Sequence, residues 1–388
     1  MKITFLTRSL DFGGAERQLV ELARGLHARG HVVKVVVFYA GGPLEGDLRT
    51  AGVPVEVLHK RGRYDLAGFN VRLAKSLRAG RPDVVHGYLG GPNIMASMLK
   101  PIHRARVIWG IRASEMDGSQ YGRWNRLDGQ FERRLAQFPD LIIANAHAGK
   151  RAIVGKGYPS HKIVVIPNGV DTERFRPDPD GRARVRAEFG IDDATPLIGR
   201  VGRLDPQKDF PAFLEMARRV GAVRPEARFI CVGQGNAAIE AELRAHAERL
   251  GISGRVHWSG ARQDMPAIYS ALDLSVSSSA YGEGTPNAVA ESMACGVPCV
   301  VTDIGDSAWT AGGFGAVVPA GDADALTRAV MAQLDLIGRG ASEPAAVRAS
   351  IVTRLSLGLL VERTGAALDT VLSANRNAAA REQNGAAA

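Results

Sequence analysis

Short apolar, β-branched runs alternate with amphipathic stretches along the first 166 residues of the chain. Within residues 15–29, Leu19, Leu22, Ala23 and Leu26 recur at the spacing of one helix face. Alternation of strands with helices is typical of a parallel α/β sheet that is covered on both faces. The apolar runs predict strands at residues 2–6, 31–39, 53–58, 84–86, 106–111, 141–144 and 163–166.

The alternation stops between residues 167 and 195, where Pro-Asn-Gly and Pro-Asp-Pro-Asp-Gly are typical of turns and linkers. It then resumes, with predicted strands at 197–201, 228–232, 256–258, 272–276 and 298–302 and helices at 210–220, 237–250, 264–271 and 286–295. A chain of 388 residues exceeds the size at which one core keeps growing. We therefore predict an N-terminal α/β domain (1–166), an interdomain segment (167–195), a second α/β domain (196–373) and a flexible tail (374–388).

The sharpest local pattern is Glu283-Gly-Thr-Pro-Asn-Ala-Val-Ala-Glu291, which follows a predicted strand. Pro286 stands where a helix would begin, a position that proline favours. The unpaired N–H groups of a helix N-terminus attract phosphate oxygens, and carboxylates accept hydrogen bonds from sugar hydroxyls. Taken alone, the pattern is equally compatible with a capped surface helix that carries two solvated glutamates.

Together with the Ser-Met-Ala-Cys-Gly-Val-Pro that follows, this pattern resembles the signature of the retaining glycosyltransferases of family 4, glycosyl transferases group 1. Further segments agree in the order of that family: Asp11-Phe-Gly-Gly-Ala-Glu-Arg17, Pro167-Asn-Gly-Val-Asp171 and Ile198-Gly-Arg-Val-Gly-Arg-Leu-Asp-Pro-Gln-Lys208. The resemblance implies the GT-B fold, in which two Rossmann-like parallel-sheet domains face each other across a cleft.

The resemblance also assigns a donor site. It implies that Arg203 and Lys208 hold the nucleotide diphosphate, where fixed cations neutralise the charge that grows on the leaving group. Glu283 is expected to bind the donor sugar and Glu291 the ribose. Two glycines of the first domain would let a helix N-terminus approach the diphosphate. The further donor-binding candidates are Gly13, Gly14, Arg262 (near the base), Thr285, Asn287 and Ala288.

The chain departs from the family at the end of the strand predicted at 106–111. Many members have a histidine there, whereas this chain reads Arg112-Ala-Ser114-Glu115. Arg112 and His86, which ends another predicted strand, are therefore alternative catalytic candidates, although a histidine at a strand end is also a common structural hydrogen-bonding group. No nucleophile–base pair is evident. The resemblance implies same-face substitution in which the departing phosphate takes the acceptor's proton.

Positive charge is concentrated in the first 170 residues, which hold 26 Lys and Arg against 13 Asp and Glu, a surplus of 13. The whole chain carries +9, so the remainder carries −4. An anionic membrane surface or a phosphorylated lipid fits the basic half, as does a solvated face without a partner. Nucleic acid is not expected, because the chain has no Lys/Arg-rich arm and no known nucleic-acid-binding motif.

Three cysteines without paired spacing argue for a reducing compartment and against a zinc site. Asp178-Pro-Asp180 and Asp322-Ala-Asp324 imitate a metal motif but lie in predicted loops. We expect no cofactor and no obligatory metal, only a nucleotide-sugar co-substrate, with UDP favoured over GDP. The expected location is the cytoplasm, with peripheral contact at the inner face of the membrane.

The principal hypothesis is transfer of a hexose or N-acetylhexosamine to a lipid-linked or saccharide acceptor. A sugar-nucleotide epimerase of the same architecture is a second hypothesis, since it would use a similar donor site without an acceptor. A non-catalytic nucleotide-sugar-binding protein is a third, because of the unusual segment at Arg112.

Overall fold

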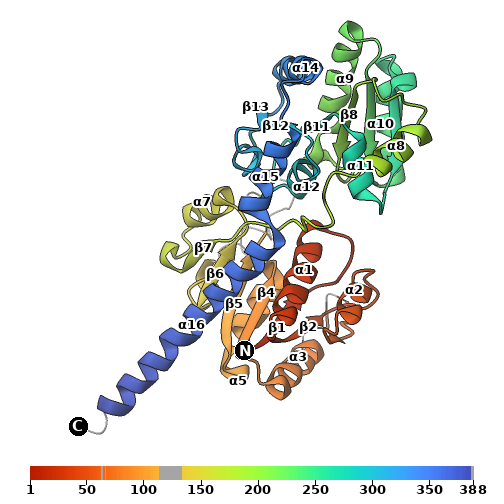
Figure 1. Ribbon diagram of the computed structural model, residues 1–388. Helices are drawn as coiled ribbons and strands as arrows, with labels where there is room; N and C mark the ends of the chain where they lie inside the picture. The colour runs from red at the N-terminus through yellow and green to blue at the C-terminus, as the bar shows by residue number, and fades with distance from the viewer. Residues whose placement is uncertain (63, 66, 113–132, 386–388) are drawn as a thin grey trace. The chain divides into compact units, whose positions relative to one another are not determined.

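The computed structural model describes residues 1–62, 64–65, 67–112 and 133–385. They form two compact units, which are coloured along the chain in Figure 1. Unit 1 contains residues 1–169 and the chain from Leu357 onward, and unit 2 contains residues 170–356. Each unit is built on its own parallel sheet, as the alternating pattern predicts.

Unit 1 has a seven-stranded sheet in the order β3-β2-β1-β4-β5-β6-β7. Every neighbouring pair is parallel. The seven strands match the predicted runs to within two residues: β1 Lys2–Thr7, β2 Val32–Val37, β3 Val55–Val57, β4 Val84–Tyr88, β5 Arg106–Ile111, β6 Leu141–Ala144 and β7 Ile163–Val165. Within the described residues, the helices of this unit are α1 Gly14–Ala28, α2 Glu45–Thr50, α3 Ala67–Gly80, α4 Gly90–Met98, α5 Lys100–His103, α7 His147–Gly155 and α16 Leu357–Gly385.

Unit 2 has a six-stranded sheet in the order β10-β9-β8-β11-β12-β13. Its strands are β8 Leu197–Val201, β9 Arg228–Val232, β10 Val256–Gly260, β11 Leu274–Ser277, β12 Cys299–Thr302 and β13 Gly315–Val318. Its helices are α8 Pro179–Glu188, α9 Phe210–Val223, α10 Ala237–Arg249, α11 Met265–Ala271, α12 Asn287–Ala294, α13 Ser307–Ala311, α14 Ala323–Gly338 and α15 Pro344–Leu355. The sequence predicted the first five strands and missed β13.

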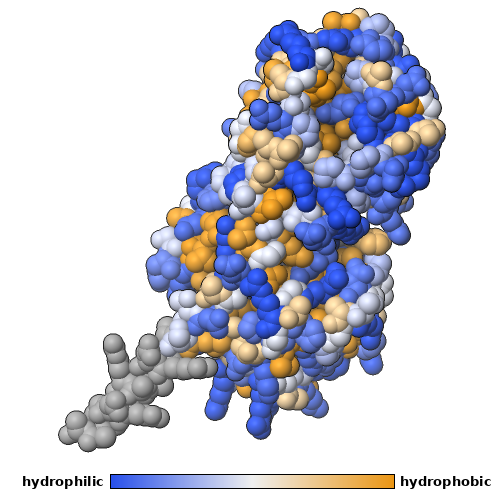
Figure 2. Space-filling model, viewed as in Figure 1, coloured by the Kyte–Doolittle hydropathy of each residue, from blue (hydrophilic) through white to orange (hydrophobic). Residues whose placement is uncertain are grey.

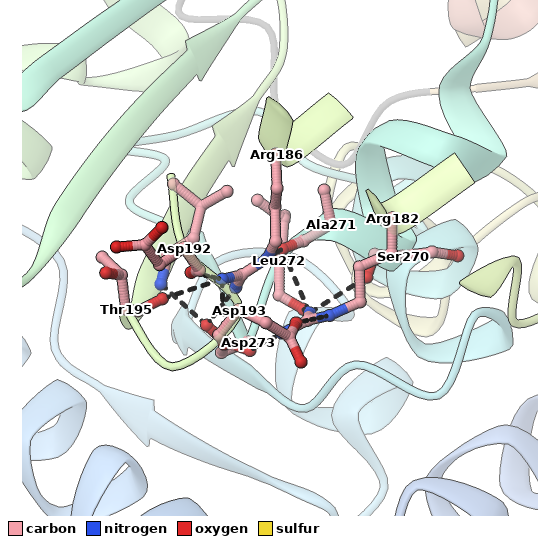
Figure 3. Close-up of polar contacts among 10 residues, drawn as sticks. Arg182, Arg186, Asp192, Asp193, Thr195, Ser270, Ala271, Leu272 and Asp273 are labelled. Atoms are coloured by element: carbon pink, nitrogen blue, oxygen red, sulfur yellow. Dashed lines mark hydrogen bonds and ion pairs between the residues drawn. The ribbon is translucent and has the colours of Figure 1, made fainter. Parts of the chain in front are cut away.

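The predicted interdomain segment 167–195 is too long, because most of it belongs to unit 2. Helix α8 is fixed there by two arginines that converge on Asp273 (Figure 3). Arg186 is buried, and its Nη2 lies 2.6 Å from Oδ2 of Asp273. Arg182 donates to Oδ1 at 2.9 Å. Asp273 also accepts the Leu197 N–H at the start of β8, so one carboxylate joins α8 to the sheet.

The predicted second domain, 196–373, is also wrong at its C-terminal end, because α16 returns to unit 1 and packs against α1. The two helices approach each other closely at Gly25, where a Cβ atom would lie 2.3 Å from Cγ2 of Val361, so this position of α1 requires glycine. Leu360, Val361 and Leu368 complete the apolar core beside Leu26. The helix continues to Gly385 through most of the predicted tail; residues 386–388 lie outside the described part of the chain.

Candidate active site

Two loops at the carboxyl ends of β8 and β11 bring Lys208 and Glu283 together. The Nζ atom of Lys208 lies 2.5 Å from Oε1 of Glu283, with side chains that are 19% and 8% exposed. The Asp205 side chain accepts the backbone N–H of Lys208 and so shapes its loop. The Ala280 N–H donates to the Gln207 carbonyl, which ties the two loops together. The fold therefore brings these two segments into contact.

Arg200, the fourth residue of β8, supports this pair and was not among the predicted site residues. Its guanidinium is buried and donates to the Lys208 carbonyl at 2.8 Å and to Oγ of Ser279 at 3.0 Å. Ser279 in turn donates to Oε1 of Glu283 at 2.6 Å. The only signal in the sequence is an arginine inside a short apolar strand, where a charged side chain needs internal partners.

Glu283 is held as a carboxylate. Burial raises its pKa, but the charge and hydrogen bond of Lys208, the Ser279 hydroxyl and the charge of Arg200 outweigh burial and bring the pKa below its ordinary value. Burial lowers the pKa of Arg200, against the opposing effect of Glu283. The site therefore contains one anion that is compensated by two cations, of which Lys208 is the more accessible.

Helix α12 begins directly after Pro286, as predicted, with Asn287 and Ala288 as its first residues. Thr285 is buried just before it. Glu291 is only 7% exposed and accepts the Tyr269 hydroxyl at 2.9 Å. Both glutamates of the motif are buried, so the alternative of a surface helix with solvated glutamates is wrong.

Two other predicted donor-site cations lie in different surroundings. The side chain of Arg203 is 69% exposed, and its Nη2 lies 2.9 Å from Oδ2 of Asp205. Its guanidinium is therefore accessible to a ligand that binds at this loop. Arg262, after the edge strand β10, pairs with Asp264 and Glu188. These two hydrogen-bonded carboxylates raise the pKa of Arg262. To bind the base of the donor nucleotide, Arg262 would have to contact it while also paired with Asp264 and Glu188.

Among the predicted residues of unit 1, Gly13 and Gly14 lie after the carboxyl end of β1, and Arg112 directly follows β5. The prediction that His86 ends its strand is wrong, because β4 continues to Tyr88 and His86 is its third residue. Gly13 caps helix α1 in an extended conformation, and Gly14 is the first residue of that helix. His86 is fully buried, and Arg112 lies over the ring of Tyr88, with 4.2 Å between the guanidinium carbon and the ring centroid. Ser114 and Glu115 lie outside the described residues.

The two Asp-x-Asp segments have structural roles in unit 2. The Asp178 side chain accepts the Gly181 N–H and caps α8, and Asp322 accepts the Ala325 N–H and caps α14. Among the described residues, no cluster of three or more His, Cys, Asp or Glu side chains is arranged to hold a metal ion. Cys231, Cys295 and Cys299 are buried free thiols.

None of the helices in the described part of the chain combines the length and apolar character needed to span a membrane. Hydrophobic side chains nevertheless gather on part of the visible face of unit 1, among hydrophilic residues (Figure 2).

Two family models match the chain in succession. Residues 12–174 match Glycosyltransferase Family 4, and residues 195–366 match Glycosyl transferases group 1. The chain belongs to glycosyltransferase family 4. The resemblance drawn from the Glu283–Glu291 motif is thereby confirmed.

Two similar proteins are named as mannosyltransferases. The lipopolysaccharide core biosynthesis mannosyltransferase LpsB of Rhizobium meliloti is 31% identical over 53% of this chain and 59% of its own length. A GDP-mannose-dependent phosphatidylinositol monomannoside mannosyltransferase of Mycolicibacterium smegmatis is 32% identical over 51% of this chain and 54% of its own. The chain thus spans somewhat more than half the length of these relatives.

The architecture of this family 4 chain matches solved structures over nearly its full length. The crystal structure of Anabaena HepE in complex with UDP-glucose covers 95% of this chain and 100% of its own, with a TM-score of 0.84 and 23% identity. At that identity the match establishes the fold, which is GT-B with two Rossmann-like parallel-sheet domains.

Proposed function

We propose that the protein moves a hexose or N-acetylhexosamine from a nucleotide-diphosphate sugar to a lipid-linked or polysaccharide acceptor, with retention of the anomeric configuration. The observation that carries this proposal is the buried pair of Lys208 and Glu283 in the loops that lead to α9 and α12. A cation for the diphosphate and a carboxylate for sugar hydroxyls are the two groups that such a donor requires side by side.

In the proposed reaction, donor binding redirects Lys208 from Glu283 to a diphosphate oxygen. Glu283 keeps compensation from Ser279 and Arg200, and its freed lone pairs accept hydrogen bonds from the donor sugar. The bond from the sugar C1 to the diphosphate oxygen breaks. The acceptor oxygen bonds to C1 on the same face, and its proton passes to the leaving phosphate.

This step leaves Glu283 as an orienting group and not a covalent nucleophile. Its carboxylate keeps the Ser279 hydrogen bond and the nearby charge of Arg200, and donor hydroxyls take the place of Lys208; these contacts reduce its nucleophilicity. Mass spectrometry of protein quenched during turnover should find no glycosyl adduct on Glu283. An adduct there would contradict the proposed step.

We further propose that Arg203 binds the diphosphate, Glu291 the ribose, and the N-terminus of α12 with Thr285 the sugar or phosphate oxygens. UDP is the favoured nucleotide. HepE was crystallised with UDP-glucose, whereas the mycobacterial relative is named for GDP-mannose, so both bases belong in any assay. No obligatory metal is expected; loss of activity in EDTA with recovery in magnesium would contradict this.

The proposed acceptor is part of a cell-surface polysaccharide or glycolipid, which is supported by the name of the Rhizobium relative. The excess of Lys and Arg over Asp and Glu in the first 170 residues fits contact with anionic lipids at the inner face of the cytoplasmic membrane.

A thermal-shift screen against UDP, GDP and their sugars tests the proposal, because binding to the native state raises the melting temperature. Product analysis then separates the three hypotheses. A transferase releases the nucleoside diphosphate and forms an α-linked product from an α-linked donor, as NMR would show. An epimerase yields the epimeric donor, and a binding protein yields neither product.

A further inference from the structure

The order of strands in the unit 1 sheet reverses between β1 and β4. In open α/β sheets, ligands bind in the crevice beyond the carboxyl ends of the strands at such a point. Phe5 of β1 and His86 of β4 are register partners there, and β4 ends at Tyr88. Arg112 directly follows β5, the strand beside β4.

Arg112 is fixed by Tyr88 and has hydrogen-bonding capacity to spare. Its guanidinium lies over the Tyr88 ring, and its Nη2 donates to the Tyr88 hydroxyl. The Nε and Nη1 atoms are both buried, and neither has a hydrogen-bond partner among the residues that the structure describes. Within the described ranges, no carboxylate lies within ion-pair distance of Arg112, although arginines at other strand ends, such as Arg106, have one.

The neighbours of Arg112 do not neutralise it. Burial raises the pKa of the Tyr88 hydroxyl, which therefore stays protonated at neutral pH. His86 lies with its ring centroid 5.0 Å from that of Tyr88, and in the described part of the chain neither of its ring nitrogens has a hydrogen-bond partner. Burial, with a smaller effect of Arg112, lowers the pKa of His86 well below its ordinary value, so the ring is neutral. A partly buried cation without a counter-ion is costly and calls for an anionic partner.

We propose that Arg112 binds an anionic group, a carboxylate or a phosphate, on the saccharide substrate of this protein. The proposal rests on the proposed function, since it names a chemical class for a substrate of that reaction. The free Nε and Nη1 donors supply charge-assisted hydrogen bonds, and Tyr88 holds the guanidinium in place. A neutral hydroxyl would leave the positive charge uncompensated.

Three pairs of probes, each a charged and a neutral compound, test the proposal on the full chain by isothermal titration calorimetry. UDP-glucuronate against UDP-glucose places the anion on the donor. Glucuronate and glucose 6-phosphate against glucose, each with UDP present, place it on the acceptor. In at least one pair, the charged probe should bind about tenfold more tightly than the neutral one, a typical effect of one charge-assisted contact.

The preference for the charged probe should vanish in Arg112→Met and weaken in Arg112→Lys and Tyr88→Phe. It should persist in Arg78→Met, a matched change of an exposed arginine on α3. Thermal melting of each variant shows whether it is folded. If Arg112→Met does not fold, Arg112→Lys and Tyr88→Phe still show whether the preference for the charged probe depends on Arg112.

Equal affinity for charged and neutral probes in the wild-type protein overturns the proposal, as does a preference that survives Arg112→Met. UDP and GDP alone provide the separate test of the proposed function. If either binds while no anionic preference exists, only the anion site fails. If neither binds, the proposed donor site fails first.

Discussion

The ammonium group of Lys208 and the carboxylate of Glu283 form a largely buried ion pair, with 2.5 Å between Nζ and Oε1. Loss of one partner leaves the other charge without its main counter-ion. Lys208→Ala is therefore expected to lower the free energy of unfolding by about 3 kcal/mol, near the lower end of the range for such pairs because Ser279 and Arg200 remain. Urea unfolding at pH 7 measures this change.

The double variant Lys208→Met with Glu283→Gln removes both charges and should recover part of that stability. An unfolding curve for Lys208→Ala that coincides with the wild type would show that the pair does not form in solution.

Arg203 offers the cleaner test of diphosphate binding, because its side chain is 69% exposed and paired only with Asp205 in the described structure. Arg203→Ala should lower kcat/KM, and the fall should correspond to a loss of about 2.7–4 kcal/mol of transition-state stabilisation. The free energy of unfolding should stay within about 0.5 kcal/mol of the wild type. Arg218→Ala on α9, another exposed arginine paired with a nearby acid, is the control and should leave kcat/KM unchanged.

Arg200 is expected to act on donor binding through the Lys208 loop. Arg200→Met keeps the length of the side chain but leaves the Lys208 carbonyl and Ser279 without this donor. We expect the KM for the donor to rise about tenfold, the effect of roughly one lost hydrogen bond of 1–1.5 kcal/mol. Steady-state kinetics over a range of donor concentrations measures it. A purely structural residue would lower the melting temperature and leave this KM unchanged.

The ionised state of Glu283 makes part of the stability depend on pH. Its pKa is lower in the folded protein than in the unfolded chain, so the folded protein gains stability above the unfolded value of about 4.3. That gain is lost as the pH falls through the folded pKa. The difference in unfolding free energy between wild type and Glu283→Gln should be constant from about pH 7 to 5 and shrink below about 4.3. A difference that grows on acidification would reverse the assignment.

Asp273 is predicted to be the main support of helix α8. Asp273→Asn leaves Arg182 and the buried Arg186 without their shared carboxylate and should cost about 3–5 kcal/mol. Asp193→Asn is the matched control: Asp193 also pairs with Arg182, but its side chain is 86% exposed. That variant should lose less than about 1 kcal/mol. Comparable losses in both variants would show that burial does not set the strength of these contacts.

Helix α8 also shows why the domain boundary was predicted too late in the chain. Its sequence, from Pro179 to Glu188, contains one large apolar residue, Val185, and carries no apolar stripe. The helix is held by Arg186 and by contacts to residues some 80 positions away, which a pattern of hydrophobic spacing does not register. The strands were predicted well because parallel strands buried on both faces are locally apolar.

In the candidate site, too, some features could be predicted from short segments of sequence, whereas others depend on packing. The motif from Glu283 to Glu291 and the cation Lys208 are recognisable from short segments, and the fold brings Lys208 to Glu283. Burial and pairing depend on the whole unit. Arg200 lies within an ordinary apolar strand, and only the packing of that strand shows that its side chain supports Ser279. Strand β13 was missed because it has only four residues, begins with Gly315 and is followed directly by Pro319, so it carries little local signal.

Because α16 belongs to unit 1, this unit is discontinuous along the chain. The Gln18 side chain holds both backbone groups of Gly169, where the chain leaves the unit, and Leu360 packs into its core after the chain returns. During synthesis, the apolar face of α1 is made first, and residues 29–356, about 330 residues, must follow before its partner helix α16 is made. Unit 2, by contrast, is continuous and can complete its own core earlier. During synthesis on the ribosome, unit 2 should therefore complete its core before unit 1, although unit 1 begins first in the sequence.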